Sequence, residues 1–282
     1  MNDDKIFALN ILREQYNELS RRPISDMGLT VGLENGDNYF EWRVTIMGAK
    51  DTCYEGSTFL VNIKFPEDYP KRRPEIAFWN PIYHINVNPN DNIEGESRGH
   101  VSFKAIDEWK PETTAKELLI KLFSIFYWPN PDCCYGIQRA EEFINKKSLY
   151  DLKTRYFVKK YASGLAFNNI YNKDWDFSCD EKNLNDLVGL KKELTLKELN
   201  DNDNEIITLE FSDGKKNIYF KCKMNEPAKD VVQRVINKLG ITKKIDSDDI
   251  LFITQFRRLI LDISIKSNRL KNGNSIIIIC RD

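Results

Sequence analysis

Three runs of strand-forming residues in the first third of the chain most constrain how it can fold. They are YFEWRVTIM (39–47), STFLVNIKF (57–65) and EIAFW (75–79), all rich in β-branched and aromatic residues. The segments between them contain the Gly, Asp and Pro residues that are typical of turns, at the spacing of successive hairpins. We therefore expect an antiparallel meander in which each strand pairs with the next.

Helical patterns flank the strand runs. Residues 5–20 form a helical pattern that stops before Pro23, with apolar side chains on one stripe: Ile6, Leu9, Leu12 and Tyr16. Residues 113–128 form another, which Thr113 or Thr114 would cap, and residues 138–162 continue as a further helical segment. A helix, a meander and C-terminal helices together predict an α+β fold.

The remaining residues divide into a polar stretch and a second patterned region. Residues 163–203 form an acidic linker, in which 187–199 could be a short amphipathic helix, most simply for packing. Residues 204–282 contain a hairpin, a helix that ends at Gly240 and two late strands, which predicts a small β-grasp unit. We accordingly expect domains at 1–162 and 204–282, joined by that linker.

Composition excludes several classes of function. Lys and Arg number 42 against 43 Asp and Glu, so no excess charge favours nucleic acid. No apolar run is long enough for a membrane span, and no apolar stretch near the N-terminus indicates a secretory signal. The six cysteines are scattered and only two histidines occur, so we expect no metal site, no cofactor and reduced thiols in a cytoplasmic or nuclear compartment.

The first 162 residues contain a series of ordered short motifs. They run WRVTIMG, YEGSTF, FPEDYP, the Tyr-His-x-Asn element of residues 83–86, GHVSF (99–103), WKP (109–111) and YWPNPD (127–132). In this order they closely resemble the ubiquitin-conjugating enzymes. The resemblance implies the fold of that family, with an N-terminal helix, a four-stranded antiparallel meander and C-terminal helices.

Ser102 occupies the nucleophile position of the family pattern, where the resemblance implies a cysteine. In the family a cysteine thiolate accepts ubiquitin as a thioester and passes it to a lysine amine. A thiol suits this task because its pKa, about 8.5, leaves some thiolate at neutral pH. A serine hydroxyl needs a general base, and its ester transfers slowly to an amine.

Other residues of the motif are retained. The resemblance implies that the Asn86 amide steadies the oxyanion during transfer and that His84 holds the loop by hydrogen bonds. Ile85 replaces the usual proline, and the loop of residues 87–98 is longer than the family expects. That insertion could occlude the site or recruit a partner.

Three explanations would keep the chain catalytic. His100 lies two residues before Ser102 and could act as its base, although a surface histidine is the simpler interpretation. Cys133, where the family often has an acidic residue beside the active site, or Cys134 could supply a nucleophile; ordinary small side chains are the simpler interpretation. Finally, Ser102 could be an engineered replacement that traps an oxyester, which would fit the retention of His84 and Asn86.

The family's ligase-facing residues also differ here. An apolar anchor is expected after DYP, but the chain has Lys71, and the position after Trp109 and Pro111, usually small, is Glu112. We expect these four residues to mark the partner surface and common ligases to dock weakly. The partners implied are ubiquitin or a ubiquitin-like modifier, with an activating enzyme or another conjugating enzyme as further candidates.

The C-terminal unit resembles a ubiquitin-like domain through its order of elements and the stretch LFITQFRRLILD (251–262). It ends IICRD without a Gly-Gly tail, so we expect a recognition module rather than a conjugated modifier. The first hypothesis is therefore a catalytically impaired conjugating-enzyme variant that binds or regulates. The rival hypothesis is a working conjugating enzyme with an engineered Ser102 or an unusual thiol such as Cys133.

Overall fold

The computed structural model divides the chain into two compact units, residues 1–192 and 193–282. It describes residues 3–24, 27–90, 97–106, 109–164, 175–179, 206–247, 249–254, 257–265, 268 and 270–280. The proposed helix at 187–199 and residues 91–96, half of the 87–98 insertion, lie outside the described residues. The domain limits expected from the sequence stay a prediction. No helix in the described ranges is both long and apolar enough to cross a bilayer.

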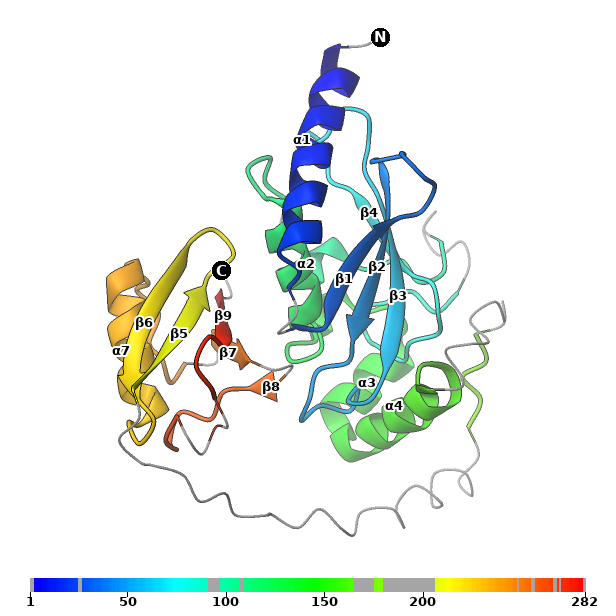
Figure 1. The fold of residues 1–282 in the computed structure, drawn as a ribbon. Coiled ribbons are helices and arrows are strands. Elements are labelled where there is room, and N and C mark those ends of the chain that lie inside the picture. Colours follow the sequence, from blue (N-terminus) through cyan, green and yellow to red (C-terminus); the bar gives the residue numbers. More distant parts are fainter. Residues whose placement is uncertain are drawn as a thin grey trace. The chain divides into compact units, whose positions relative to one another are not determined.

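The first unit contains a four-stranded sheet in the order β1-β2-β3-β4, with every neighbouring pair antiparallel (Figure 1). Its strands are β1 (Leu29–Leu33), β2 (Glu41–Met47), β3 (Thr58–Lys64) and β4 (Glu75–Phe78). The meander predicted from the sequence is confirmed. The strand runs had missed β1, whose sequence LTVGL is short and contains a glycine.

The core of this unit follows from the alternation of side chains along β2 and β3. Buried residues lie directly opposite one another in the pairs Trp42 with Ile63, Val44 with Val61, and Ile46 with Phe59. Because the side-chain period of a strand is two, one face of the sheet becomes continuous apolar surface. Ile76 and Phe78 extend that surface onto β4.

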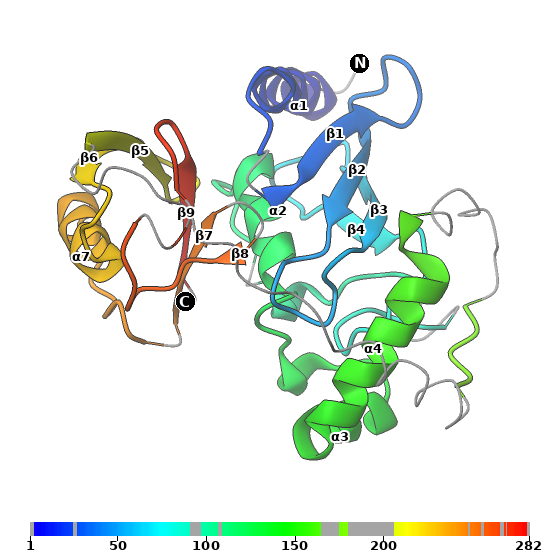
Figure 2. The same cartoon turned by 60° about the horizontal axis from the view of Figure 1, so that its bottom comes forward.

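Helices complete the first unit: α1 (Asp3–Arg21), α2 (Ala115–Ser124), α3 (Ile137–Asn145) and α4 (Lys147–Tyr161), with short 3-10 turns η2 (Phe103–Ala105) and η3 (Pro131–Cys133). Thr114 caps α2 through a capping box with Glu117, as one of the two predicted caps. The segment predicted as one helix from 138 is instead two, which Figure 2 shows side by side, because Lys146 leaves helical geometry at φ −136°.

The predicted apolar stripe of α1 was wrong at its first residue. Ile6 is 40% exposed, while Leu12 is fully buried and Tyr16 packs edge-on against Trp42. The buried positions of the helix are Ala8, Leu12 and Leu19. The buried face therefore begins at Ala8, two residues after the start of the predicted stripe.

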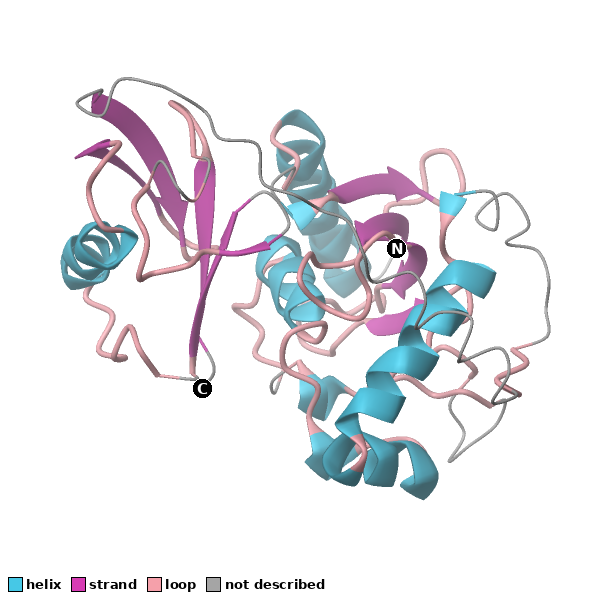
Figure 3. Ribbon diagram, turned by 90° about the horizontal axis from the view of Figure 1, so that it is seen from below, coloured by secondary structure: helices cyan, strands magenta, loops and turns pink. Residues whose placement is uncertain are grey.

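The second unit is a five-stranded sheet in the order β6-β5-β9-β7-β8 with one helix on one side (Figure 3). The elements are β5 (Ile206–Ser212), β6 (Asn217–Lys223), α7 (Ala228–Leu239), β7 (Ile250–Thr254), β8 (Arg257–Arg258) and β9 (Ser275–Cys280). Strands β5 and β9 are parallel, and three late strands replace the expected two. Gly240 ends α7 in the left-handed conformation at φ +73°, as predicted.

Candidate active site

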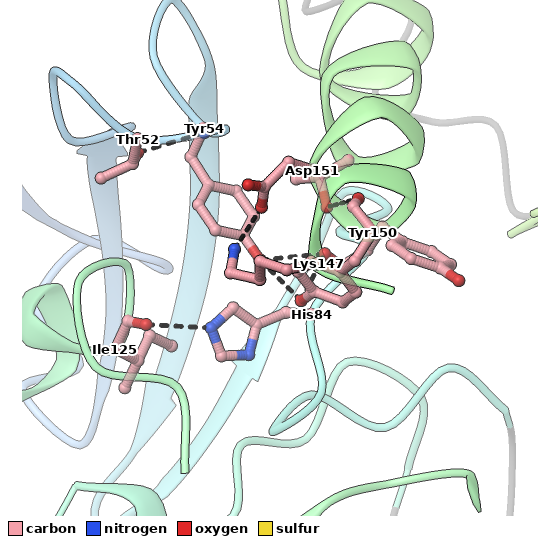
Figure 4. Close-up of polar contacts among 9 residues, drawn as sticks. Thr52, Tyr54, His84, Ile125, Lys147, Tyr150 and Asp151 are labelled. Atoms are coloured by element: carbon pink, nitrogen blue, oxygen red, sulfur yellow. Dashed lines mark hydrogen bonds and ion pairs between the residues drawn. The ribbon is translucent and has the colours of Figure 1, made fainter. Parts of the chain in front are cut away.

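His84 is buried at the centre of the first unit. Its Nδ1 accepts a hydrogen bond from the Asn86 amide at 3.0 Å, so Nε2 carries the proton and donates to the Ile125 carbonyl at 3.1 Å (Figure 4). Burial lowers the pKa of His84 from 6.5 to about 4. The ring is therefore neutral at pH 7 with both nitrogens engaged, and it is unavailable as a general base.

Two buried tyrosines form the wall beside His84. The Tyr54 hydroxyl lies 3.1 Å from that of Tyr150 and donates to the Tyr83 carbonyl at 3.0 Å. The Tyr54 ring lies 5.5 Å from the imidazole, and burial raises the pKa of Tyr54 well above its ordinary value. This polar cluster is satisfied internally, and it fixes the loop that follows His84.

Asn86 ties that loop to the η3 turn. Its Nδ2 donates to the Asn130 carbonyl at 2.6 Å and to the Cys133 carbonyl at 3.1 Å. Its Oδ1 accepts from the Asn130 amide at 2.8 Å, and the side chain is fully buried. The side-chain amide of Asn86 therefore donates its hydrogen bonds to backbone carbonyls of the turn and stabilises that turn.

Ser102 is brought to Asn86 by a close approach of the backbone at Gly99. Gly99 has φ +84°, and a Cβ there would lie 2.1 Å from the Phe78 carbonyl oxygen, so only glycine fits. The chain then runs beside β4, with the Val101 amide donating to the Ile76 carbonyl. The Ser102 amide donates to the Asn86 carbonyl at 3.0 Å, and its side chain is half-buried.

The Cys133 thiol donates to the Asn130 carbonyl at 3.7 Å, and the neighbouring Ser102 hydroxyl lowers the pKa of that thiol. The Asn86 Nδ2 atom also lies 3.5 Å from the Cys133 Sγ atom. Burial raises the pKa of Cys133 by more than the Ser102 hydroxyl lowers it. The structure thus brings together three residues singled out in the sequence: Ser102, Asn86 and Cys133.

His100 was expected on the surface, and this expectation was wrong. The residue is only 9% exposed, because the segment that carries it is paired on both sides. It forms an antiparallel bridge with Ala77 of β4, and its carbonyl accepts from the Asn88 amide. The extended backbone at this point places the histidine against the sheet rather than in solvent.

The loop of residues 66–73 has charged side chains on its surface, while Tyr69 anchors it in the core. The Lys71 Nζ atom donates to Asp4 of α1 at 2.7 Å, and this bond raises the pKa of Lys71. Arg72 pairs with Asp68 within the loop, and the Arg73 guanidinium lies 4.7 Å from the Phe103 ring centroid. Lys71 is thus placed on the exposed surface beside α1.

Trp109 has a structural position between two loops. Its Nε1 donates to the Pro70 carbonyl at 2.8 Å, and its ring lies 5.7 Å from that of Tyr69. Pro111 and Glu112 are exposed just beyond it. Of the four predicted partner-binding residues, Lys71, Pro111 and Glu112 are available at the surface, while Trp109 is half-buried.

Asn130 was missed by sequence reasoning. Beyond its backbone bonds to Asn86, its Oδ1 accepts from the Asp132 amide, and its Nδ2 donates to the Lys104 carbonyl beside η2. It therefore connects both turns of the site. The available signal was an Asn between Pro129 and Pro131, where the amide side chain caps a turn that the prolines bend. Within the described ranges no group of three or more His, Cys, Asp or Glu side chains could hold a metal ion.

Comparison with known proteins identifies the family. A family model of the ubiquitin-conjugating enzymes matches residues 11–158, and the chain belongs to this family. Ubiquitin-conjugating enzyme E2 15 of Schizosaccharomyces pombe is 32% identical over 158 residues, covering 53% of this chain and 92% of that protein. A crystal structure of a Plasmodium yoelii protein assigned to the same enzymes gives 24% identity and a TM-score of 0.48, over 56% of this chain and 96% of that one.

Proposed function

We propose that the chain is a catalytically impaired ubiquitin-conjugating enzyme variant that acts as a binding or regulatory subunit in a ubiquitin or ubiquitin-like conjugation pathway. The observation that carries the proposal is the pair formed by Ser102 and Cys133. At the nucleophile position the chain presents a hydroxyl, and the neighbouring Cys133 thiol has a pKa raised by burial, which keeps it protonated at neutral pH. Neither group is an activated nucleophile.

The state of His84 supports the same conclusion. A serine nucleophile needs a base within hydrogen-bond reach that can take its proton. His84 has both ring nitrogens in hydrogen bonds to the backbone of Asn86 and Ile125, and its low pKa makes it a poor proton acceptor. It holds the loop in place and does not activate Ser102.

The alternative is an active conjugating enzyme whose nucleophile is an engineered Ser102 or Cys133. Two features favour it: both His84 and Asn86 are present, and the side-chain Nδ2 of Asn86 lies 3.5 Å from the Cys133 sulfur. The raised pKa of Cys133 speaks against it, because a nucleophilic thiol is usually stabilised as the thiolate. We therefore rank it second.

The expected partners follow from the family and from the surface charges. Ubiquitin or a related modifier is the first, and an activating enzyme or another conjugating enzyme the second. The exposed Lys71, paired with Asp4, replaces an apolar anchor, so ligases that need such an anchor should bind weakly. We expect the protein in the cytoplasm or nucleus, since its six cysteines form no disulfide among the described residues.

The second unit is proposed to be a ubiquitin-like recognition module. Its support is the order of a hairpin, helix α7 and late strands, with β9 parallel to β5 in the middle of the sheet. A core of aliphatic residues fills the space between the sheet and α7, including Leu209, Val231 and Ile278. Such a unit would add a second binding surface to the chain.

A charging and binding experiment tests the proposal. The unmodified chain and a Cys133→Ala variant are incubated with activating enzyme, ATP and ubiquitin, and analysed on non-reducing gels. We expect no adduct on either chain, together with retention of ubiquitin or a charged conjugating enzyme on immobilised protein. A thiol-sensitive adduct that disappears with Cys133→Ala would establish the alternative. An adduct that survives thiols but not hydroxylamine would indicate an oxyester on Ser102.

A further inference from the structure

Residues 175–179, Trp-Asp-Phe-Ser-Cys, lie in an extended conformation beside helix α4 (Figure 1). Their side chains alternate: Trp175, Phe177 and Cys179 are half-buried, while Asp176 and Ser178 are exposed. A period of two is the pattern of an extended peptide that presents one side to a protein surface. We call these five residues the Phe177 segment.

Phe177 is the centre of the contact. Its ring packs edge-on against Phe157 of α4 at a centroid distance of 5.0 Å and against Tyr83 at 5.6 Å. Tyr161 lies 6.3 Å away, and the neighbouring Trp175 ring 6.0 Å away, both also edge-on. Edge-to-face pairs at such distances are favourable beyond the burial of apolar area.

A buried guanidinium lies under the ring. The Arg139 Cζ atom is 4.4 Å from the Phe177 centroid and 4.5 Å from the Tyr83 centroid, and the residue is 9% exposed. Its Nη1 atom is buried and has no hydrogen-bond partner among the residues that the structure describes. A desolvated cation held by two aromatic faces gains from cation–π attraction, but its orphan donor carries a desolvation cost.

Asp176, the residue before Phe177, contacts the protein through both its charged side chain and its backbone carbonyl. The Asp176 carboxylate pairs with the Lys160 Nζ atom at 3.0 Å, and the Asp176 carbonyl accepts from the Tyr161 hydroxyl. Hydrogen bonds from Ser178 and the pair with Lys160 hold the pKa of Asp176 well below its usual range. An acidic residue and the aromatic residue after it thus have separate, complementary contacts.

We propose that this surface is a recognition site for an extended peptide that carries Asp followed by Phe, and that the chain fills it with its own Phe177 segment. The surface, here called the Arg139 surface, consists of Tyr83, Arg139, Phe157, Lys160 and Tyr161. Asp176 and Phe177 supply an ion pair, a hydrogen bond and ring contacts to it, so a partner protein that presents an exposed Asp-Phe pair can replace these contacts. The unpartnered Nη1 leaves one donor that the resident segment does not use, so an incoming peptide with a further acceptor can compete.

This site is separate in its chemistry from the cluster of Ser102, Asn86 and Cys133. It uses a cation, aromatic faces and a lysine, and it contains no nucleophile. The proposal does not depend on whether the chain is catalytically active, because it describes an additional partner contact. The resident segment would act as an intramolecular competitor, which lowers the apparent affinity for the partner peptide.

The first test uses Phe177→Ala in the full chain, which removes the ring that occupies the Arg139 surface. A fluorescein-labelled peptide that copies residues 173–178 is titrated with this variant and with the unmodified chain, and polarisation is measured. We expect at least tenfold tighter binding to the variant. Adding Lys160→Ala should weaken binding several-fold, whereas Lys159→Ala, the matched exposed lysine of α4, should leave it within twofold. Equal binding to Phe177→Ala and the unmodified chain would overturn the proposal, as would equal binding of a peptide in which Phe is replaced by Ala.

A second measurement uses the unmodified chain, so it does not depend on the folding of a variant. Cys179 is half-buried within the Phe177 segment, and its alkylation rate, followed by mass spectrometry of the peptide that contains it, reports displacement. The Asp-Phe peptide should raise that rate several-fold at saturation, and the Ala-substituted peptide should not. No change in the Cys179 rate at saturating peptide would mean that the segment is a fixed strap and not a displaceable ligand.

Discussion

The candidate site has a back, formed by His84 and Asn86, and a front, formed by Ser102 and Cys133. The two pairs differ in burial and in hydrogen bonding. At the back, His84 and Asn86 are fully buried, and their ring nitrogens and carboxamide make hydrogen bonds to backbone atoms. At the front, Ser102 and Cys133 are half-buried, and the Ser102 hydroxyl lowers the pKa of the Cys133 thiol. The buried residues are therefore fixed by the fold, while Ser102 and Cys133, which we propose stand where the reacting atoms would lie, are more accessible.

This difference shows which residues the fold requires and which residues only a reaction would require. Replacing His84 or Asn86 leaves buried polar groups of other residues without hydrogen-bond partners. This loss costs folding free energy whatever the protein does. Changing Ser102 alters one partly exposed hydroxyl. A chain can consequently lose or exchange its nucleophile while it retains the residues around it, so the retention of His84 and Asn86 is no proof of catalysis.

The largest expected effect concerns Asn86. Asn86→Ala removes the acceptor of the Asn130 amide and the side-chain donor to the Asn130 and Cys133 carbonyls, and the Asn130 carbonyl keeps only its contact with the Cys133 thiol. We expect the free energy of unfolding of the first unit to fall by roughly 4 kcal/mol, measured by urea denaturation. Hydrogen exchange at the Asn130 amide should accelerate, because its acceptor is gone.

Asn80→Ala is the matched control for this prediction. Asn80 is also fully buried and bridges backbone groups of Leu60 and Thr58, away from the η3 turn. It should cost a comparable amount of stability without a selective change at Asn130. Equal acceleration of Asn130 exchange in both variants would show that Asn86 has no special role in the turn.

The next effect is a pH dependence from His84. Its pKa is lower in the folded chain, about 4, than the ordinary 6.5, so the unfolded chain binds the extra proton first. Stability should therefore fall as the pH drops from 6.5 to 4, by about 3 kcal/mol in total, and level off above pH 6.5. The lowered pKa values of Asp68 and Asp176 act below about pH 4, so they do not cover this window.

His84→Gln separates the histidine from other groups. The variant should be less stable at neutral pH, since its side chain cannot reproduce both bonds, but its stability should change little between pH 6.5 and 4. Thermal unfolding of both proteins across that range measures the difference. A slope in the variant as steep as in the unmodified chain would contradict the assignment.

The smallest expected effect concerns the front of the site. Ser102→Ala removes the hydroxyl that stabilises the Cys133 thiolate, so the pKa of Cys133 should rise further and its alkylation should slow about twofold. The free energy of unfolding should change by less than about 0.5 kcal/mol, because Ser102 is half-buried. A large loss of stability would show that Ser102 supports the fold, as His84 and Asn86 do, and would contradict this prediction.

The sequence predicted the meander well because β2 and β3 alternate between buried and half-buried residues, and the motif order indicated the family. It also placed Ser102, Asn86 and Cys133 in one site through the resemblance. It did not reveal β1, whose pattern is weak, or the end of the helix at Lys146, where neither Gly nor Pro marks the break.

The contacts that sequence reasoning missed depend on the tertiary structure. Ser102 and Cys133, which lie 31 positions apart in the sequence, become neighbours only in the fold, and the role of Asn130 depends on the fold of two turns. The buried position of His100 follows from pairing with Ala77 on β4, which no local pattern encodes. The docking of Phe177 on Arg139 occurs within a stretch that its composition marked as a linker.

The most direct test of the central claim, that Ser102 and no other part of the site blocks thioester formation, compares the unmodified chain with Ser102→Cys combined with Cys133→Ala. The second change is needed because two thiols at these neighbouring positions could form a disulfide. With activating enzyme, ATP and ubiquitin, intact-protein mass spectrometry should show a thiol-sensitive ubiquitin adduct on the double variant and none on the unmodified chain. A ubiquitin adduct on the unmodified chain, or an uncharged but folded double variant, would contradict the account.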